Sequence, residues 1–256
     1  TFADQMISEG MESPTQFEVL TATAFLYFAV NNVEYAVIEV GLGGLLDSTN
    51  VVLPEVSVIT NIAFEHAALC GGTLEGIAHH KAGIIKDGVP VITGAKGMTL
   101  DILHQEAADK NTDLFIEDTD FKVQFLRYDG HKQYILFTST IIGVSAEFSL
   151  NLLGDHQVRN GALAIMTAYL LANDEKRITI ESIRTALENV KWPGRFERFD
   201  TNGKTIVIDG AHNPAGILML RQNLDKYFYG NQRIFLLGIL KDKAVDVMLK
   251  TLLRPD

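Results

Sequence analysis

The sequence predicts an α/β protein with a mostly parallel sheet and a small antiparallel β appendage. Three nearly all-apolar runs have the length of buried strands: residues 35–40, 56–62 and 89–93. A helical stretch lies between the last two, and strands that alternate with helices form parallel sheets through right-handed crossovers. The appendage is predicted over residues 114–150, where apolar residues alternate and Asp129-Gly130 provides a hairpin turn.

Local start signals predict the helices. Ser13 as the capping residue, Pro14 at the first helical position and Gln16 three residues after the cap predict the start of a first helix. Periodicity predicts further helices at residues 73–84, 155–171, 180–187 and 214–227, with a last one near the C-terminus. Two further strands are predicted at residues 205–209 and 234–238.

A break in the pattern predicts a domain boundary near residue 197. The segment Lys191-Trp192-Pro193-Gly194-Arg195 interrupts the helices, and a new α/β unit follows it. We therefore expect one domain at residues 1–197 and the start of another at residues 198–256. The second has only two predicted strands, too few for an independent open sheet, so we expect the chain to stop inside a domain.

Charge and cysteine content narrow the class of protein. The formal net charge of −10 argues against a large nucleic-acid-binding surface, which needs basic residues. The single cysteine, Cys70, cannot form an internal disulfide, which favours a reducing, cytoplasmic setting. Apolar stretches are too short to cross a bilayer, and no signal-peptide pattern opens the chain. We expect a soluble protein with no nucleic-acid or membrane partner.

Polar residues at the predicted strand ends could hold a metal ion. Glu39 ends the first strand and Glu65-His66 follows the second, and ligands collect at this edge of parallel sheets. Such a carboxylate-rich, water-accessible site suits Mg²⁺ beside phosphates. A single Glu or His at a strand end is more often a cap or a solvated loop residue. Lys81, on the following helix, would by itself be an ordinary exposed lysine.

Two glycine-containing segments only partly match phosphate-binding loops. Gly41, Gly43 and Gly44 do not have the G-x-G-x-x-G spacing, which argues against a hydride-transfer cofactor. Asn202-Gly203-Lys204-Thr205 has Arg198 where a P-loop needs glycine, and a strand follows it instead of a helix. We interpret the second segment as a turn.

A second group of residues could bind a nucleotide. Gln157 and Asn160 are three apart near a helix start, so their amides could meet the edge of a heterocycle. Arg195 follows Pro193-Gly194 in a rigid turn that could aim its guanidinium at phosphate. Asp209, with His212 close behind, lies at a strand end where it could accept ribose hydroxyls. Capping for Asn160 and a surface ion pair for Arg195 are the alternatives.

Taken together, these segments resemble a known family. Five segments match the signatures of folylpolyglutamate synthases in order and spacing: residues 13–18, 39–50, 81–86, 192–197 and 209–214. These proteins belong to the wider Mur ligase superfamily. The resemblance implies a central ATPase domain followed by the start of a Rossmann-like C-terminal domain.

The resemblance also implies a reaction and a set of roles. In that family, ATP phosphorylates a folate or dihydropteroate carboxylate, and the amine of L-glutamate then attacks the acyl phosphate. It implies ATP and Mg²⁺ as cofactors, a protein that is usually monomeric, and closure of two domains on the substrate. The implied metal-site residues are Glu39, His66 and Lys81, the lysine being carbamylated in the family. The implied nucleotide contacts are Gln157, Asn160, Arg195, Asp209 and His212.

Departures from the family pattern leave two alternatives open. Many relatives have arginine near Leu45 and aspartate at Glu65, and the family P-loop, which lies upstream of Ser13, has no counterpart in this sequence. We therefore do not expect this chain alone to complete the reaction. The alternatives are a cell-wall ligase that acts on a UDP-sugar and a catalytically silent nucleotide-binding protein. The Glu39 loop and the Ser13-Pro14-Thr15 segment favour the folate branch.

Overall fold

The computed structural model describes residues 2–64, 70–241 and 243–254. The chain divides into two compact units, Thr1–Phe115 and Ile116–Asp256, which are described separately. Within the described residues, no helix is both long enough and apolar enough to span a bilayer. The predicted α/β class is confirmed, because parallel and antiparallel sheets are both present.

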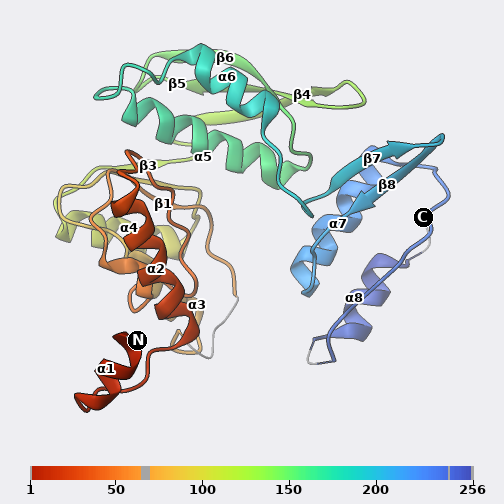
Figure 1. Ribbon diagram of the computed structural model, residues 1–256. Coiled ribbons are helices and arrows are strands. Elements are labelled where there is room, and N and C mark those ends of the chain that lie inside the picture. The colour runs from red at the N-terminus through yellow and green to blue at the C-terminus, as the bar shows by residue number, and fades with distance from the viewer. Residues whose placement is uncertain (1, 65–69, 242, 255–256) are drawn as a thin grey trace. The chain divides into compact units, whose positions relative to one another are not determined.

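The first unit is built around a small sheet in the order β1-β2-β3, whose last strand ends just past the boundary (Figure 1). The strands are β1 (Ser57–Ile59), β2 (Val91–Thr93) and β3 (Leu114–Ile116), and β1 pairs with β2 in parallel. The helices α3 (Leu74–Ala82) and α4 (Met98–Asp109) connect them. A buried cluster that includes Ile59, Ala82, Val91 and Leu103 forms the core.

Two helices precede this sheet, and the start of the second differs from the prediction. The short helix α1 (Phe2–Ser8) was not predicted, and α2 (Gln16–Val30) is capped by Thr15 instead of Ser13. The Thr15 hydroxyl accepts from the Glu18 amide at 3.2 Å, and the Glu18 carboxylate accepts from the Thr15 amide at 2.6 Å. This capping box satisfies two helix-end amides, which the predicted Ser13–Gln16 pair does not do.

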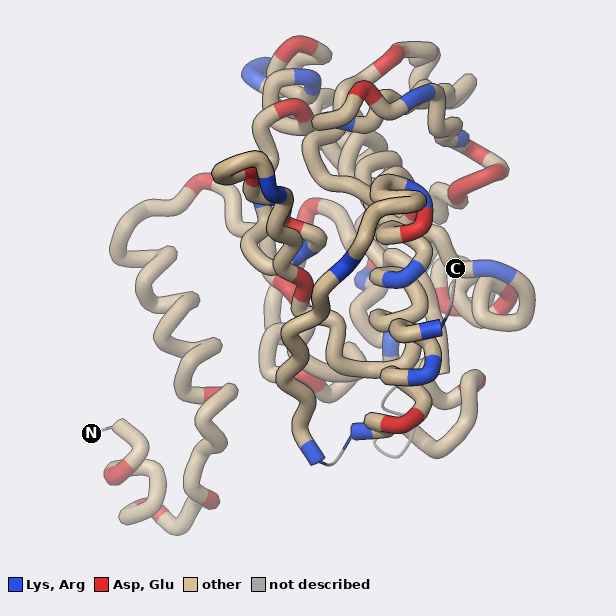
Figure 2. The backbone as a smooth tube through the Cα atoms, turned by 90° about the vertical axis from the view of Figure 1, so that its right-hand side faces the viewer, with Lys and Arg blue, Asp and Glu red and all other residues tan. Residues whose placement is uncertain are grey.

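Helix α2 is mostly apolar in sequence and has no buried residue. In Figure 2, α2 is the longer helix that follows the short one at the N-terminus, and Glu18 is its one charged residue. Its predicted apolar face includes Phe17 and Leu20, which are 42% and 57% exposed. An apolar helix is normally buried, so these side chains form an uncovered surface.

The prediction of two strands is wrong, because neither forms in the structure. Residues 35–40 and 234–238 have no regular secondary structure, although both runs are apolar. Val37 and Leu236 are fully exposed, and Ile234 is 97% exposed. A strand exists only where a neighbouring strand pairs with its backbone, and none does so for these runs within the described residues.

The second unit opens with the predicted antiparallel sheet, in the order β4-β5-β6. Its strands are β4 (Lys122–Tyr128), β5 (Gln133–Ser139) and β6 (Val144–Leu150). Burial alternates along β5, and α5 (Asp155–Leu171) packs against the sheet through Gly161, where a Cβ would contact Leu150 at 3.4 Å. Helix α6 (Ile180–Asn189) follows.

The rest of the unit is a hairpin followed by two helices. The hairpin consists of β7 (Glu197–Thr201), which was not predicted, and β8 (Lys204–Ile208). Asn202-Gly203 forms its turn with positive φ values of 50° and 69°, so the interpretation of this segment as a turn is confirmed. The helices are α7 (Pro214–Tyr227) and α8 (Val245–Leu252). The domain boundary near residue 197 stays a prediction.

Candidate functional site

The glycine loop after residue 40 lies directly against the end of α3 that carries Lys81. The Leu45 amide donates to the His80 carbonyl at 2.7 Å. Gly44 has φ +147°, and a Cβ there would lie 2.5 Å from the His80 oxygen and 3.3 Å from the Lys81 Cα. Glycine is therefore required at this point, because only a residue without a side chain allows so close an approach.

Asn50 holds the other end of the loop on the same helix end. Its side-chain amide donates to the carbonyls of Leu45 and Gly83, each at 3.0 Å. The Lys86 ammonium group donates in turn to the Asn50 carbonyl at 3.1 Å. The loop is thus bonded to His80, Gly83 and Lys86 around the end of α3, and these bonds fix its position relative to Lys81.

Asp47 organises the interior of the loop and begins the short helix η1 (Ser48–Val51). One carboxylate oxygen accepts from the Leu42 amide at 2.8 Å, and the other from the Thr49 amide at 2.9 Å and the Thr49 hydroxyl at 2.5 Å. Partial burial raises the pKa of Asp47, but these bonds, led by the Thr49 hydroxyl, outweigh it and lower the pKa overall. Asp47 is therefore an anion with a structural role.

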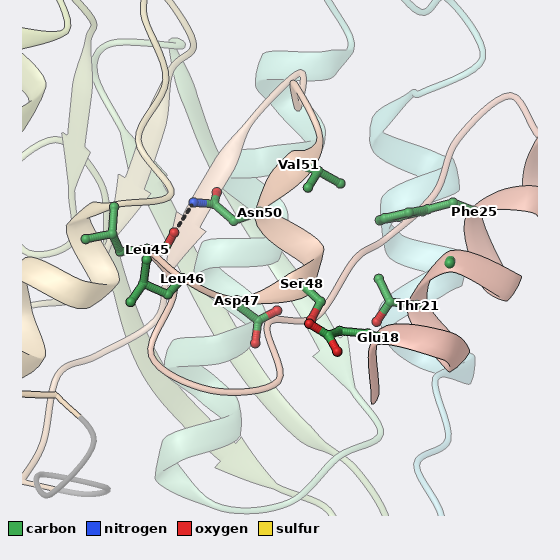
Figure 3. A pocket seen from close by; sticks show the side chains of 10 residues that line it. Glu18, Thr21, Phe25, Leu45, Leu46, Asp47, Ser48, Asn50 and Val51 are labelled. Atoms are coloured by element: carbon green, nitrogen blue, oxygen red, sulfur yellow. Dashed lines mark hydrogen bonds between the residues drawn. The ribbon is translucent and has the colours of Figure 1, made fainter. Parts of the chain in front are cut away.

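A cavity of about 530 Å³ lies between this loop and α2 (Figure 3). Helix α2 contributes Glu18, Thr21, Ala22 and Phe25, and the loop with η1 contributes Leu45, Leu46, Asp47, Ser48, Asn50 and Val51. The Glu18 carboxylate is held by Thr15, whose amide and hydroxyl lower the Glu18 pKa. The hydroxyls of Thr21 and Ser48, beside Phe25, suit a flat, partly polar organic molecule. Sequence reasoning did not identify this cavity.

The predicted metal residues are only partly described. Glu39 is exposed just before the glycine loop, and Lys81 is half-buried in the last turn of α3. His66 and Glu65 lie outside the described residues. Within the described residues, no group of three His, Cys, Asp or Glu side chains could hold a metal ion. Mg²⁺ keeps several waters and needs only one or two protein carboxylates, so an exposed Glu39 fits that ion.

Two predicted nucleotide residues come together at the start of α5. The Asn160 side-chain amide donates to the Gln157 side-chain oxygen, Oε1, at 3.2 Å. Neither residue is buried, so the remaining donors and acceptors of both amides are available to a ligand. Gly154, with φ +112°, provides no side-chain cap for the helix, and its carbonyl accepts from the Gln157 amide at 3.0 Å.

Arg195 and Asp209 lie in the turns before and after the hairpin, and a backbone hydrogen bond joins these two turns. The Gly210 amide donates to the Gly194 carbonyl at 2.7 Å, and a Cβ on Gly210 would lie 4.0 Å from an Arg195 guanidinium nitrogen. The two Asp209 carboxylate oxygens accept from the amides of Phe196 and Ala211, each at 2.8 Å. Each oxygen keeps a further lone pair, so Asp209 can hold the turn and still accept a hydroxyl.

His212 is exposed and oriented by its own turn. Its Nδ1 lies 2.9 Å from the Gly210 carbonyl oxygen. Because a carbonyl can only accept, this contact assigns the proton to Nδ1 and leaves Nε2 as an acceptor directed elsewhere. Asn213 caps α7 by accepting from the Gly216 amide at 2.7 Å, and Pro214 occupies the first turn of that helix.

Sequence reasoning missed His156, which lies in the first turn of α5 next to Gln157. Burial lowers the pKa of His156, Asp209 and Asp155 raise it, and Arg195 lowers it. The charges of Asp209 and Arg195, from the turns around the hairpin, thus act on a histidine in the first turn of α5. The Nδ1 atom of His156 is buried with no hydrogen-bond partner in the part of the chain that the structure describes. Its position next to Gln157 was the only signal in the sequence.

Two family models match the chain. The Mur ligase middle domain matches residues 4–168, and the Mur ligase glutamate ligase domain matches residues 194–254. The residues predicted to bind a nucleotide come from both matched regions.

Individual relatives agree with these models. A folylpolyglutamate synthase from Lacticaseibacillus casei is 40% identical over 91% of this chain and 54% of that protein. A dihydrofolate synthase/folylpolyglutamate synthase from Bacillus subtilis is 35% identical over 93% of this chain and 56% of that protein. The chain therefore spans about half the length of the curated relatives it matches.

Solved structures extend the agreement to three dimensions. The folylpolyglutamate synthase of Thermotoga maritima superimposes with a TM-score of 0.87 at 37% identity, covering 98% of this chain and 57% of that one. An FPGS complex with AMPPCP and folate has a TM-score of 0.86 at 37% identity, covering 98% of this chain and 61% of that one. The chain belongs to the Mur ligase family, on its folylpolyglutamate synthase/dihydrofolate synthase branch.

Proposed function

We propose that the protein containing this chain is an ATP-dependent ligase that joins L-glutamate to a folate. The observation that carries the proposal is the placement of the loop at residues 41–50, which lines the cavity and also contacts the end of α3 at Lys81. A substrate in that cavity would lie beside the lysine that the family resemblance assigns to the metal site. The FPGS complex with AMPPCP and folate supports the same substrate class.

The cavity is the proposed site for the flat part of the folate. The Phe25 ring offers an aromatic face, and the hydroxyls of Thr21 and Ser48 offer hydrogen bonds. The family resemblance places an arginine near Leu45 in many relatives, and Leu45 itself offers no charged contact to a substrate. We propose that dihydropteroate, which has the same ring system, is accepted too.

The second unit supplies the proposed nucleotide contacts. Gln157 and Asn160 would bind the adenine edge, Asp209 the ribose, and Arg195 the phosphates. Nε2 of His212 is an acceptor available to the nucleotide. Each proposed role uses an atom that the local hydrogen bonds leave available.

Mg²⁺ is the proposed metal, held by Glu39 and His66 with support from Lys81, and when bound it neutralises phosphate charge. Phosphorylation by ATP turns the folate carboxylate, a poor electrophile, into an acyl phosphate that the glutamate amine can attack. Carbamylation of Lys81 would replace a cation with an anion beside the metal. We propose a cytoplasmic protein, because the lone Cys70 is buried and free. The family resemblance further implies a monomer.

The test uses the full-length protein with Mg²⁺-ATP, L-glutamate and either a reduced folate or dihydropteroate. ADP release and product mass are followed, and Lys81→Ala is compared with Lys110→Ala, which changes a surface lysine 3.9 Å from Asp87. We expect a product one glutamyl unit heavier, abolished by Lys81→Ala and unchanged by Lys110→Ala. Nucleotide binding with neither substrate converted would exclude the folate assignment and favour the cell-wall or silent alternatives.

A further inference from the structure

A buried polar network joins the two regions that the family models match. The Tyr227 hydroxyl, at the end of α7, donates to the Gln133 side-chain oxygen at 3.0 Å and accepts from the Gly154 amide at 3.0 Å. The Gln133 side-chain NH₂ group donates to the Leu152 carbonyl at 2.6 Å and the Gly154 carbonyl at 3.2 Å. Gln133 is fully buried, so its partners are protein groups and not solvent.

The network closes on the residue from which α5 begins. Gly154 is the N-cap of α5, and both its amide and its carbonyl are bonded by the network. At φ +112°, a Cβ on Gly154 would lie 2.7 Å from His156 Cε1 and 2.8 Å from the Asn223 amide of α7. Gly154 therefore fits closely between α7 and the first turn of α5, three residues before Gln157.

Other contacts hold Tyr227 in place. Its ring makes an edge-to-face contact with Tyr128 at a centroid distance of 4.8 Å and lies 5.9 Å from Phe196, which precedes β7. The adjacent Lys226 pairs with Asp155, in the first turn of α5, at 2.5 Å. Burial raises the pKa of Tyr227 to about 12, so its hydroxyl stays protonated and can donate at any physiological pH.

We propose that Tyr227 is a positioning residue for nucleotide binding. Through Gly154 and Gln133, its hydroxyl sets where the Gln157–Asn160 pair of the middle region stands relative to Asp209 and Arg195 of the C-terminal region. This inference rests on the nucleotide site in the proposed function. The nucleotide itself contacts neither Tyr227 nor Gln133, and both act through the start of α5.

The test replaces only the hydroxyl, with Tyr227→Phe in the full-length protein. The ring contacts remain, while the Gly154 amide and the Gln133 oxygen lose a partner. The matched control is Tyr134→Phe, which removes a hydroxyl that donates to Asp129 at 2.9 Å on an exposed hairpin. Steady-state kinetics and ADP binding by calorimetry are measured well below the unfolding midpoint of each variant.

We expect Tyr227→Phe to raise the KM for ATP and the Kd for ADP by about 3- to 10-fold. The KM for glutamate and kcat at saturating ATP should change less than about twofold. Tyr134→Phe should match the unaltered protein. A second variant, Gln133→Met, should raise the same KM, and combining it with Tyr227→Phe should add little, because both changes break one network.

A purely structural role predicts a different pattern. A protein that is only destabilised loses active molecules, so kcat falls while KM and the ADP Kd stay constant. That result for Tyr227→Phe would overturn the positioning role and leave the ligase proposal standing. If the unaltered protein binds no nucleotide, the proposed function and this inference both fail.

Discussion

Arg159 and Glu117 form a bidentate ion pair in which only the arginine reaches solvent. Arg159 donates from Nε to both carboxylate oxygens, at 3.0 and 2.9 Å, and from Nη2 to Oε2 at 2.6 Å. The Glu117 side chain is 2% exposed and that of Arg159 is 41% exposed. Since Arg159 lies directly before Asn160, the pair anchors the helix turn that carries a proposed adenine contact.

This asymmetry predicts unequal effects of breaking the pair. Arg159→Met leaves a buried carboxylate without its cation and should lower the free energy of unfolding by about 3 kcal/mol. Glu117→Gln leaves an arginine that water can reach, so it should lower the free energy of unfolding by only about 1 kcal/mol. Urea unfolding measures the free energy of unfolding of both variants. The control is Arg184→Met, which breaks the exposed ion pair with Glu181. Its free energy of unfolding should stay within about 0.5 kcal/mol of that of the unaltered chain. Equal losses of unfolding free energy for Arg159→Met and Glu117→Gln would contradict the unequal burial of the two side chains.

Filling the cavity should weaken folate binding selectively. Thr21→Phe places a ring in the space beside Phe25 and should raise the KM for folate about tenfold or more, with the KM for ATP unchanged. Thr23→Phe on the same helix is the control, because Thr23 is exposed, bonds to the Val19 carbonyl and does not line the cavity. The KM values are measured by steady-state kinetics on the full-length protein. An equal rise in the KM for folate in both variants would mean that folate does not bind in this cavity.

The β4–β5 hairpin should lose stability in acid. The amides of Lys132 and His131 and the Tyr134 hydroxyl donate to Asp129 and lower its pKa from 3.8 to about 2. A depressed folded-state pKa stabilises the protein above the unfolded-state value, and this contribution disappears as pH falls towards 2. The difference in thermal midpoint between the unaltered chain and Asp129→Asn should therefore be largest above pH 4 and shrink below it. A difference independent of pH would contradict this role of Asp129.

The exposed apolar runs should make the chain bind hydrophobic dyes. Val37 and Ile234 are almost entirely exposed, so Val37→Lys with Ile234→Lys should reduce ANS fluorescence. Because neither side chain is buried, each substitution should change the free energy of unfolding by less than about 0.5 kcal/mol. Unchanged fluorescence would mean that the dye binds elsewhere, with α2 as the next surface to alter.

Helix boundaries could be predicted wherever the signal was local. The bounds of α5 and α7 match the predicted ranges, because the signals are local: the apolar period for both helices, and for α7 also the Asn213 cap and the first-turn Pro214. The start of α2 was misplaced because Ser13 and Thr15 are both plausible caps, and the Glu18 carboxylate decides between them. Strands at residues 35–40 and 234–238 could not be judged from composition, since a strand depends on a partner elsewhere.

The same distinction applies to the candidate site. The Gln157–Asn160 contact follows from a spacing of three residues on one helix, which the sequence displays. The Tyr227–Gln133 bond joins residues 94 apart, and no local pattern marks either of them. The cavity was missed for a similar reason, because its walls come from α2 and from a loop about twenty residues later.

The tight fit of the glycine loop against α3 determines where this protein can tolerate change. A side chain at Gly44 would meet the His80 carbonyl at 2.5 Å, and one at Gly83 would meet the Leu45 Cβ at 2.5 Å. Leu46 and Val51, by contrast, line the cavity and are 83% and 77% exposed. Substitutions that alter substrate preference can therefore accumulate on the cavity side of the loop, while Gly44 of the loop and Gly83 of the α3 end are constrained to glycine where the two segments touch.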